Sequence, residues 1–158
     1  MLTRIDHVGI ACRNLAEKIA FYESVFGLRL VSVEVNEQQG VREAMMVVSA
    51  SAAGMSCVQL LEPLGPDTPV GRFLARRGEG IHHVGYGVTD ITAALASIGA
   101  SGVRLLDARP RHGSMGASVA FLHPADAGGV LTELVQAPIE GDITDKMMLY
   151  GQEHGSTA

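Results

Sequence analysis

Apolar and polar residues alternate over residues 4–11, a pattern typical of a β-strand whose two faces have different surroundings. On such a strand Val8 and Ile10 share one face and are expected to pack under helices. His7 and Gly9 share the other face. The histidine is therefore expected to point into whatever space the sheet encloses.

A helix is expected directly after this strand. Asn14 and Glu17 form a capping-box-like start, and Gly27 can end the helix with a left-handed cap. The apolar residues expected on one side of it are Leu15, Ile19, Tyr22 and Phe26. Further apolar runs predict strands over 28–35, 41–49 and 55–61, with turns over 36–40 and 51–54.

A turn-rich connector follows over residues 62–80, with a short helix expected over 70–77 and ending at Gly78. The first succession of elements then begins again. A strand is expected over 81–88, and a helix starts at Asp90 with Gly99 and Gly102 beyond its end. Three more strands are predicted over 103–107, 117–123 and 130–136, with a Pro/Gly/Ser-rich loop over 109–116.

The repetition can be checked by counting positions. His83 lies 76 positions after His7, and Glu133 lies 74 positions after Gln59. Two cap positions repeat in the same way, Asn14 with Asp90 and Gly27 with Gly102. A near-constant internal period indicates a duplicated folding unit, here strand, helix and three strands.

Composition and charge limit the classes of function. The chain has 158 residues, enough for one domain, and its net charge of −5 argues against a general nucleic-acid binder. Cys12 and Cys57 each sit in an apolar run and do not form a disulfide framework, which indicates a reducing cytosol. Neither an N-terminal signal nor a membrane-spanning run is visible, so a cytoplasmic protein is expected.

The duplicated units place four polar residues at equivalent points among apolar neighbours. His7 and His83 lie on the first strand of each unit, and Gln59 and Glu133 lie on the last. Taken alone, each is more often a core or edge residue with ordinary hydrogen bonds. As a symmetric set, two imidazoles, an amide oxygen and a carboxylate suit a divalent first-row cation. We expect Co²⁺ first, with Mn²⁺, Zn²⁺ or Ni²⁺ as alternatives.

Glu43 is a fifth polar residue in an apolar strand. An exposed strand carboxylate beside Arg42 would explain it equally well. Next to a substrate held by a metal, a desolvated carboxylate can act as general base. The second unit has only Ala117 or Val119 near the equivalent position, so the site is expected to be chemically one-sided.

Several arginines stand out in this acidic chain. Each alone reads as a solvated surface charge, but together they could meet a phosphate-bearing ligand. They are Arg72, Arg76, Arg77, Arg109 and Arg111.

Over residues 4–137 the chain resembles the vicinal-oxygen-chelate superfamily, and within it the methylmalonyl-CoA epimerase family. The histidine strand, IDHVGIA at 5–11, carries only the superfamily resemblance, whereas the later stretches together look specific to the epimerases. These later stretches are LEPLGPDTPV at 61–70, RGEGIHHV at 77–84, VAFLHP at 119–124 and GGVLTEL at 128–134.

The resemblance implies an α+β fold of two tandem βαβββ modules forming a cup around one divalent ion. The chain turns polar after Pro138, so we expect one domain over 1–138 and a C-terminal tail over 139–158. The modules would span about 4–62 and 81–137 with a connector over 63–80. The resemblance also implies methylmalonyl-CoA as the substrate, an isomerase activity and a homodimer.

The same resemblance implies roles for individual residues. The metal ligands would be His7, Gln59, His83 and Glu133, and Glu43 would remove the proton from C2 of the substrate. Glu133 or a nearby water would deliver a proton to the opposite face of the planar enolate. We also expect Arg111 and Ser114, in the loop over 109–116, to contact the CoA part of the substrate.

Three other functions remain open at this point. A glyoxalase-type lyase or isomerase would use the same cup and metal. An extradiol dioxygenase needs only two histidines and one carboxylate on Fe(II), which would leave Gln59 and Glu43 without tasks. A metal-free drug-sequestering protein of the same fold would not need four matched ligands.

Overall fold

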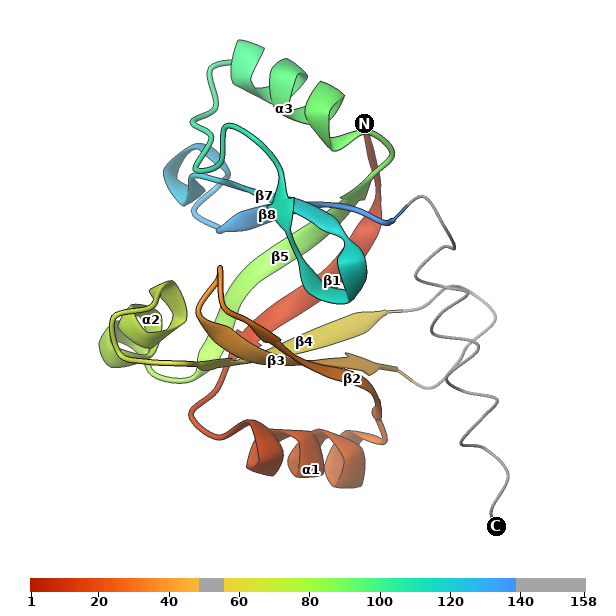
Figure 1. Cartoon of the computed structure of the whole chain (residues 1–158), viewed down its shortest axis with the longest axis vertical. Helices are drawn as coiled ribbons and strands as arrows, with labels where there is room; N and C mark the ends of the chain where they lie inside the picture. Colours follow the sequence, from red (N-terminus) through yellow and green to blue (C-terminus); the bar gives the residue numbers. More distant parts are fainter. Residues whose placement is uncertain (49–55, 139–158) are drawn as a thin grey trace.

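The computed structural model describes residues 1–48 and 56–138, and it contains the duplicated unit (Figure 1). The first module consists of β1 (Leu2–Ala11), α1 (Leu15–Phe26), β2 (Arg29–Asn36), β3 (Val41–Val47) and β4 (Cys57–Pro63). The second consists of β5 (Gly80–Val88), α3 (Ile91–Ala100), β6 (Arg111–His112), β7 (Ser118–Leu122) and β8 (Thr132–Gln136). Between them lies α2 (Pro69–Arg77), and two 3₁₀ turns cover Ser114–Gly116 and Pro124–Asp126.

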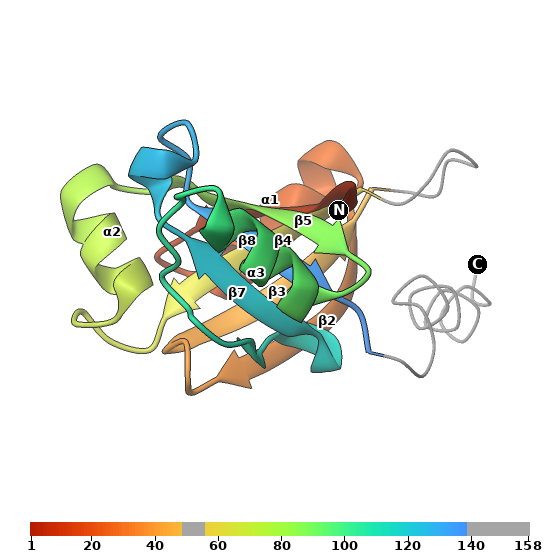
Figure 2. The same ribbon diagram turned by 90° about the horizontal axis from the view of Figure 1, so that it is seen from above.

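The strands form one mixed sheet in the order β2-β3-β4-β1-β5-β8-β7-β6. In each module the first strand runs parallel to the last, β1 to β4 and β5 to β8. The two modules join through the antiparallel pair β1–β5 at the centre of the sheet. The strands curl round, so the sheet has a concave inner face rather than lying flat (Figures 1 and 2). The two cavities described below lie on this concave side, which we call the hollow. The expected α+β cup of two βαβββ modules is confirmed.

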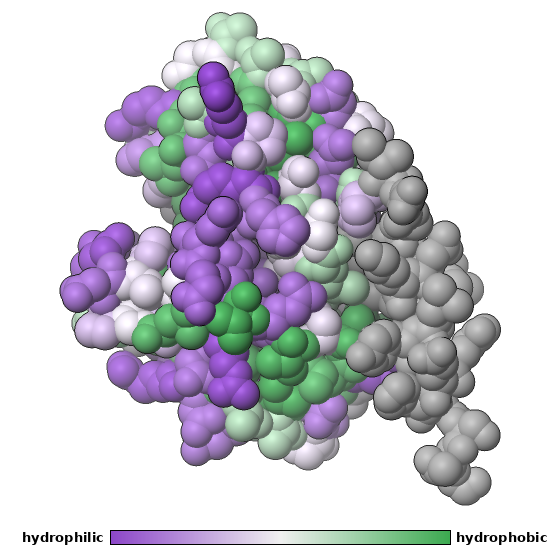
Figure 3. Space-filling model, in the orientation of Figure 1, coloured by the Kyte–Doolittle hydropathy of each residue, from purple (hydrophilic) through white to green (hydrophobic). Residues whose placement is uncertain are grey.

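The helices α1 and α3 cover the outer face of this curled sheet. Leu15 of α1 packs with Ala44, Met46 and Leu60 of β3 and β4. The corresponding cluster beneath α3 joins Ile91, Ala94 and Leu95 to residues of β5, β7 and β8. Because side chains alternate along a strand, the intervening residues point into the hollow. In the space-filling view α2 forms a lobe at the left, separated by a notch from the second module above it (Figure 3).

The predicted helix caps are present. Asn14 accepts a hydrogen bond from the Glu17 N–H, which is the N-cap half of a capping box, and its side-chain amide donates to the Glu17 carboxylate. Gly27 ends α1 in the left-handed region at φ 68°, and Asp90 caps α3 through the Ala93 N–H. Phe26 shares a side of α1 with Tyr22, as expected, with ring centroids 5.4 Å apart, although Phe26 is 59% exposed. Gly99 was wrongly placed beyond α3, which continues to Ala100.

The predicted strand over 103–107 is wrong, because this segment pairs with β7 only through an isolated bridge between Leu105 and Leu122. The N–H groups of Leu106 and Asp107 both donate to the carbonyl of Phe121. The Asp107 carboxylate then accepts from the Phe121 N–H, so a side chain replaces the backbone ladder. Pairing resumes at β6, inside the segment that was expected to be only a loop.

Two expectations, the turn over 51–54 and the tail over 139–158, lie outside the described residues. Among the helices that the structure describes, none is long and apolar enough to cross a membrane.

Candidate active site and metal centre

The junction between β1 and β5 brings the two predicted histidines together. Gly9 pairs with His83 and His7 pairs with Gly85, so each imidazole lies over the glycine of the opposite module. The Nε2 atoms of His7 and His83 are 3.0 Å apart. The parallel pair β5–β8 places Glu133 beside Gly85, and therefore beside His7.

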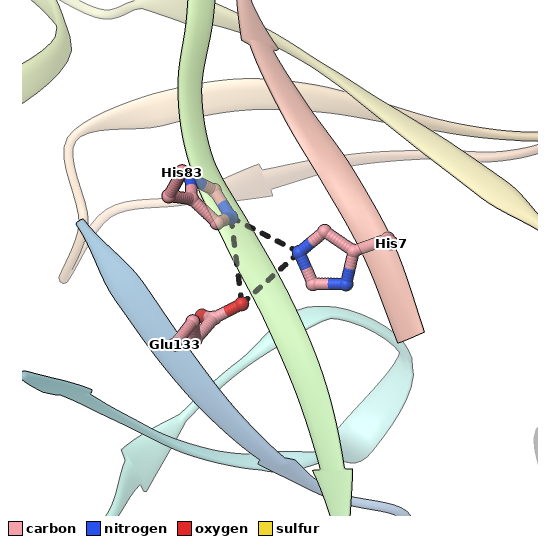
Figure 4. A group of neighbouring side chains, drawn as sticks. All are labelled: His7, His83 and Glu133. Carbon is pink, nitrogen blue, oxygen red and sulfur yellow. Dashed lines mark hydrogen bonds and ion pairs between the residues drawn. The ribbon is translucent and has the colours of Figure 1, made fainter. Parts of the chain in front are cut away.

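His7, His83 and Glu133 converge on one point inside the hollow (Figure 4). Glu133 Oε2 lies 3.0 Å from Nε2 of His7 and 3.5 Å from Nε2 of His83. All three residues are buried, as are Gln59 and Glu43. A buried carboxylate and two imidazoles whose ligand atoms all lie within 4.8 Å of one another are a metal-binding arrangement.

The charges of this cluster are strongly coupled. Burial alone would lower the pKa of the His7 imidazole, but the Asp6 and Glu133 carboxylates raise it to about 9. Burial would raise the pKa of the Glu133 carboxyl, but His7 and His83 hold it at about 2. In the metal-free site, a protonated His7 therefore neutralises the Glu133 carboxylate. A divalent cation would take over that role from the proton.

The residues present fit a metal ion. Gln59 Oε1 is buried without a hydrogen-bond partner among the described residues, which is costly unless something else satisfies it. The Gln59 amide nitrogen is already engaged, because it donates to Glu43 Oε2 and to Ser114 Oγ, each at 2.8 Å. Its oxygen is thus left to act as a ligand. His7, Gln59 and Glu133 line the same small cavity of about 20 Å³.

Glu43 stands next to this cluster on β3. It pairs with Leu61 on β4, two positions beyond Gln59, and its Oε1 has no partner in the described structure. Burial raises the pKa of Glu43 to about 7, despite a hydrogen bond with Ser114 that lowers it. A carboxyl group with a pKa near neutrality can both take up and release a proton at physiological pH.

The site is one-sided, as the sequence predicted. In the second module Val119 pairs with Val135, two positions beyond Glu133, which is the place that Glu43 holds in the first module. Val119 is buried and apolar. Of the two equivalent positions, only Glu43 can therefore exchange a proton.

A larger cavity of about 160 Å³ adjoins the cluster on the side of His83. Most of its wall is apolar, including Val41, Leu61 and Phe121, whereas Gln38, Gln39 and Arg111 supply polar groups. A small carbon skeleton can enter such a space and present polar atoms to the metal ligands.

The two predicted substrate-contacting residues lie on opposite sides of the centre. Ser114 lines the small cavity and bonds to Gln59. Arg111 lines the larger cavity, but its guanidinium pairs with Asp107 at 2.9 Å and lies over the Phe121 ring. Contact of either residue with CoA stays a prediction.

Sequence reasoning missed the residues that orient the two histidines. Asp6 Oδ1 lies 3.1 Å from Nδ1 of His7, and Arg4 holds Asp6 in turn. Strand alternation alone would put His82 and His83 on opposite faces of β5, yet their Nδ1 atoms are 3.0 Å apart. Each partner directly precedes its histidine, and this repeated position was the signal available. Such partners fix the ring orientation of metal-binding histidines.

Glu34 was missed as well. Its carboxylate accepts from the N–H of Met115, the residue after Ser114, at 3.1 Å. This contact ties β2 of the first module to the turn of the second module that carries Ser114. The residues lie 81 positions apart, and no local pattern indicated their contact.

Comparisons with known proteins agree with this geometry. A family model described as the glyoxalase/bleomycin resistance protein/dioxygenase superfamily matches residues 6–121. The mitochondrial methylmalonyl-CoA epimerase of Homo sapiens is 36% identical over 137 residues, which cover 86% of this chain and 75% of that protein. The ethylmalonyl-CoA/methylmalonyl-CoA epimerase of Cereibacter sphaeroides is 34% identical over 138 residues, 86% of this chain and 99% of that protein.

A solved structure gives the same result. A variant of the Streptomyces coelicolor methylmalonyl-CoA epimerase, in complex with 2-nitronate-propionyl-CoA, superposes with a TM-score of 0.84 at 48% identity. The match covers 88% of this chain and 97% of that one. The chain therefore belongs to the glyoxalase/bleomycin resistance protein/dioxygenase superfamily and, within it, to the methylmalonyl-CoA epimerase family.

Proposed function

We propose that this protein interconverts the (2R) and (2S) epimers of methylmalonyl-CoA by moving the proton on C2. The observation that carries this proposal is the position of Glu43. It is a buried carboxyl group with a pKa of about 7, one hydrogen bond away from Gln59 in a cluster suited to a metal. Family membership supports the choice of substrate.

The substrate makes the task of each residue clear. Its C2 lies between a carboxylate and a thioester carbonyl, so loss of the C2 proton leaves an enolate with charge on oxygen. Glu43 accepts the proton, and the electron pair of the C–H bond moves into the carbonyl. Return of a proton to the opposite face of the planar carbon gives the other epimer. A positioned base contributes about 10²–10⁴-fold to such a step.

His7, Gln59, His83 and Glu133 would hold one divalent ion. When bound, the ion supplies Lewis-acid stabilisation of the negative charge that develops on the substrate oxygens. Asp6 and His82 keep the two imidazoles oriented toward the centre. We propose Co²⁺ as the ion, since the mixed set of imidazole, amide and carboxylate suits a first-row cation.

The second face of C2 needs its own proton carrier. Glu133 or a water molecule beside it are the two candidates. The pKa of Glu133 is held at about 2 by the histidines, so the carboxylate is a poor store for a proton while both imidazoles face it. This favours a water that Glu133 orients over Glu133 itself. We further propose that the enzyme works in the cytoplasm as a homodimer.

Two observations favour an epimerase over the other functions of this fold. The His7, His83 and Glu133 set alone would also suit an Fe(II) dioxygenase. Gln59 Oε1 is buried without a hydrogen-bond partner in the described structure, so it can serve as a fourth metal ligand. Glu43 supplies a general base, which the ring cleavage carried out by an extradiol dioxygenase does not need. A metal-free binding protein would bear the cost of burying these polar groups without a metal ion to satisfy them.

The proposal is tested by incubating a single epimer of methylmalonyl-CoA with the Co²⁺-loaded protein and following the epimer ratio. We expect the ratio to approach one, at a rate proportional to protein concentration. A glutathione thiohemiacetal is the matched control substrate for a glyoxalase activity. If the protein turns over the thiohemiacetal but does not epimerise methylmalonyl-CoA, the proposal is wrong and the glyoxalase function takes its place.

A further inference from the structure

The hydrogen bond between Glu34 and Met115 joins the two ends of the curled sheet. In the strand order β2 stands at one edge and β6 at the other, and the 3₁₀ turn over Ser114–Gly116 directly follows β6. Glu34 Oε2 on β2 accepts from the Met115 N–H in this turn at 3.1 Å. The turn accordingly lies next to β2 in both ribbon views (Figures 1 and 2). This contact thus links the two edges that the sheet order leaves farthest apart.

Met115 has a backbone conformation that needs support. Its φ of 55° and ψ of 27° lie in the left-handed region. It is the only non-glycine residue with a positive φ in the part of the chain that the structure describes. A side chain makes this conformation unfavourable, so it persists only where the surroundings hold it. Glu34 holds the Met115 N–H, and the Met115 side chain packs against Val31, Met45 and Val47.

The turn brings Ser114 to the proposed base and to a proposed metal ligand. Ser114 Oγ accepts from Nε2 of Gln59 at 2.8 Å, and the Ser114 hydroxyl is hydrogen-bonded to the Glu43 carboxylate. Gln59 Nε2 also donates to Glu43 Oε2, so the three side chains hold one another in place. Glu43 and Gln59 belong to the first module, whereas Ser114 belongs to the second. Ser114 can reach them only while its turn stays docked against the first module.

The position of Glu34 is unfavourable for a carboxylate that has no task. Glu34 pairs directly with Glu43 across the β2–β3 ladder. Like charges directly opposite each other on one face of a sheet repel, and many polar residues would serve an edge strand without this cost. The Met115 N–H explains the carboxylate, since a charged acceptor holds an N–H roughly twice as strongly as a neutral one.

We infer that Glu34 is a positioning residue whose carboxylate keeps the 114–116 turn docked, so that Ser114 stays hydrogen-bonded to Glu43 and Gln59. This inference rests on the proposed function, because it concerns the orientation of Glu43 as the base. Glu34 lines neither of the two active-site cavities and acts only through the turn. The feature that matters is the acceptor oxygen of Glu34 rather than its charge.

Two variants of Glu34 separate the acceptor from the charge in the Co²⁺-loaded protein. Glu34→Leu removes both, whereas Glu34→Gln removes the charge and keeps an acceptor oxygen. The comparison is made at about pH 8.5, above the pKa of about 7 of Glu43, so that the base is ionised in every variant.

We expect Glu34→Leu to lower kcat for methylmalonyl-CoA by about tenfold or more, while KM changes by less than about threefold. Glu34→Gln should recover most of the lost kcat, to within about threefold of the wild type. Glu37→Leu is the matched control, because Glu37 is exposed in the turn between β2 and β3. A Glu34→Gln variant as slow as Glu34→Leu would mean that Glu34 acts through its charge and would overturn the inference.

A double-mutant cycle with Ser114→Ala tests whether the effect passes through Ser114. In the Ser114→Ala background, Glu34→Leu should lower kcat by less than about twofold, because the residue that the turn positions is already gone. An equal loss of kcat in both backgrounds overturns the inference.

Amide hydrogen exchange separates this inference from the proposed function, because it needs no substrate. Exchange of the Met115 N–H should be about tenfold or more faster in Glu34→Leu than in the wild type, and close to the wild type in Glu34→Gln. Unchanged exchange at Met115 in Glu34→Leu overturns the inference whatever the activity. If the wild type does not epimerise methylmalonyl-CoA, the proposed function fails, while exchange at Met115 still decides whether Glu34 holds the turn.

Discussion

Gly9 lies directly across the β1–β5 ladder from His83, and a Cβ atom on Gly9 would lie 2.2 Å from Cε1 of the His83 ring. Gly85 has the same relationship to His7, with a Cβ atom 2.5 Å from Cε1 of that ring. The sequence His-Val-Gly thus occurs once in each module and interlocks with its copy. Each glycine leaves the space in which the other module's imidazole lies.

The first prediction is that Gly9→Ala or Gly85→Ala displaces a histidine and weakens metal binding. A methyl group at either position must push the ring away from Glu133. We expect the metal dissociation constant to rise by about tenfold or more, the usual range for a disturbed metal-binding histidine. Metal content after dialysis measures it. Gly65→Ala is the matched control, because nothing lies within 4 Å of its added Cβ atom. Full metal content in both site variants would show that the imidazoles are not ligands.

The second prediction separates the base from the ligands. Glu43→Gln keeps the size and hydrogen-bonding capacity of the side chain but cannot accept the C2 proton. We expect kcat to fall by about 10²–10⁴-fold with metal content unchanged. Glu37→Gln, at an exposed position in the turn between β2 and β3, should have no effect on either quantity. Loss of metal in the Glu43 variant would make Glu43 a ligand.

The third prediction concerns pH and stability. Burial raises the pKa of Glu43 in the folded state to about 7 from its ordinary value of 4.5. The folded state therefore holds this proton more tightly than the unfolded state, and the resulting stability is present below pH 4.5 and lost as the pH rises to about 7. At pH 8 the ionised carboxylate costs on the order of 3 kcal/mol.

Glu43→Gln removes this cost. The metal-free variant should be more stable than the metal-free wild type at pH 8, and the difference should shrink toward pH 4.5. Denaturant unfolding at the two pH values measures it. A stability difference that does not change with pH would place the Glu43 carboxyl in a polar environment instead. Activity of the wild type should rise with pH as Glu43 becomes a carboxylate.

The fourth prediction links metal binding to protons. The pKa of His7 is raised to about 9 in the metal-free protein, so its imidazole is protonated at pH 7.5 and must lose that proton to bind a metal. Titration of Co²⁺ in two buffers with different ionisation enthalpies should report the release of about one proton. His7→Gln should abolish this release. If the wild type releases none, His7 does not act as a ligand.

Much of the site could be predicted because the duplication gives equivalent residues of the two modules a nearly constant separation along the chain. His7 with His83 and Gln59 with Glu133 keep nearly the same separation, which marked them as equivalent positions of the two modules. The β1–β5 pairing then brings His7, His83 and Glu133 together. For Glu43 the sequence left an exposed carboxylate as an equal alternative, and the structure shows it buried. The helix caps could be predicted because they depend on residues close in sequence, as Asn14 and Glu17 interact within one turn.

Other parts depend on contacts that no local pattern records. The strand expected over 103–107 has the right apolar residues, but the Asp107 carboxylate takes the place of a backbone partner. Ser114 was noted only as a residue near CoA, whereas its hydroxyl lies between Gln59 and Glu43, 55 positions from Gln59.

Exchange of the C2 proton of methylmalonyl-CoA in deuterated water tests the central claim most directly. The Co²⁺-loaded protein should incorporate deuterium at C2, and a chelator or Glu43→Gln should each reduce incorporation by about 10²-fold or more. Mass spectrometry of the recovered thioester measures it. Rapid exchange that neither the chelator nor the Glu43 variant slows would contradict a metal-assisted proton transfer by Glu43.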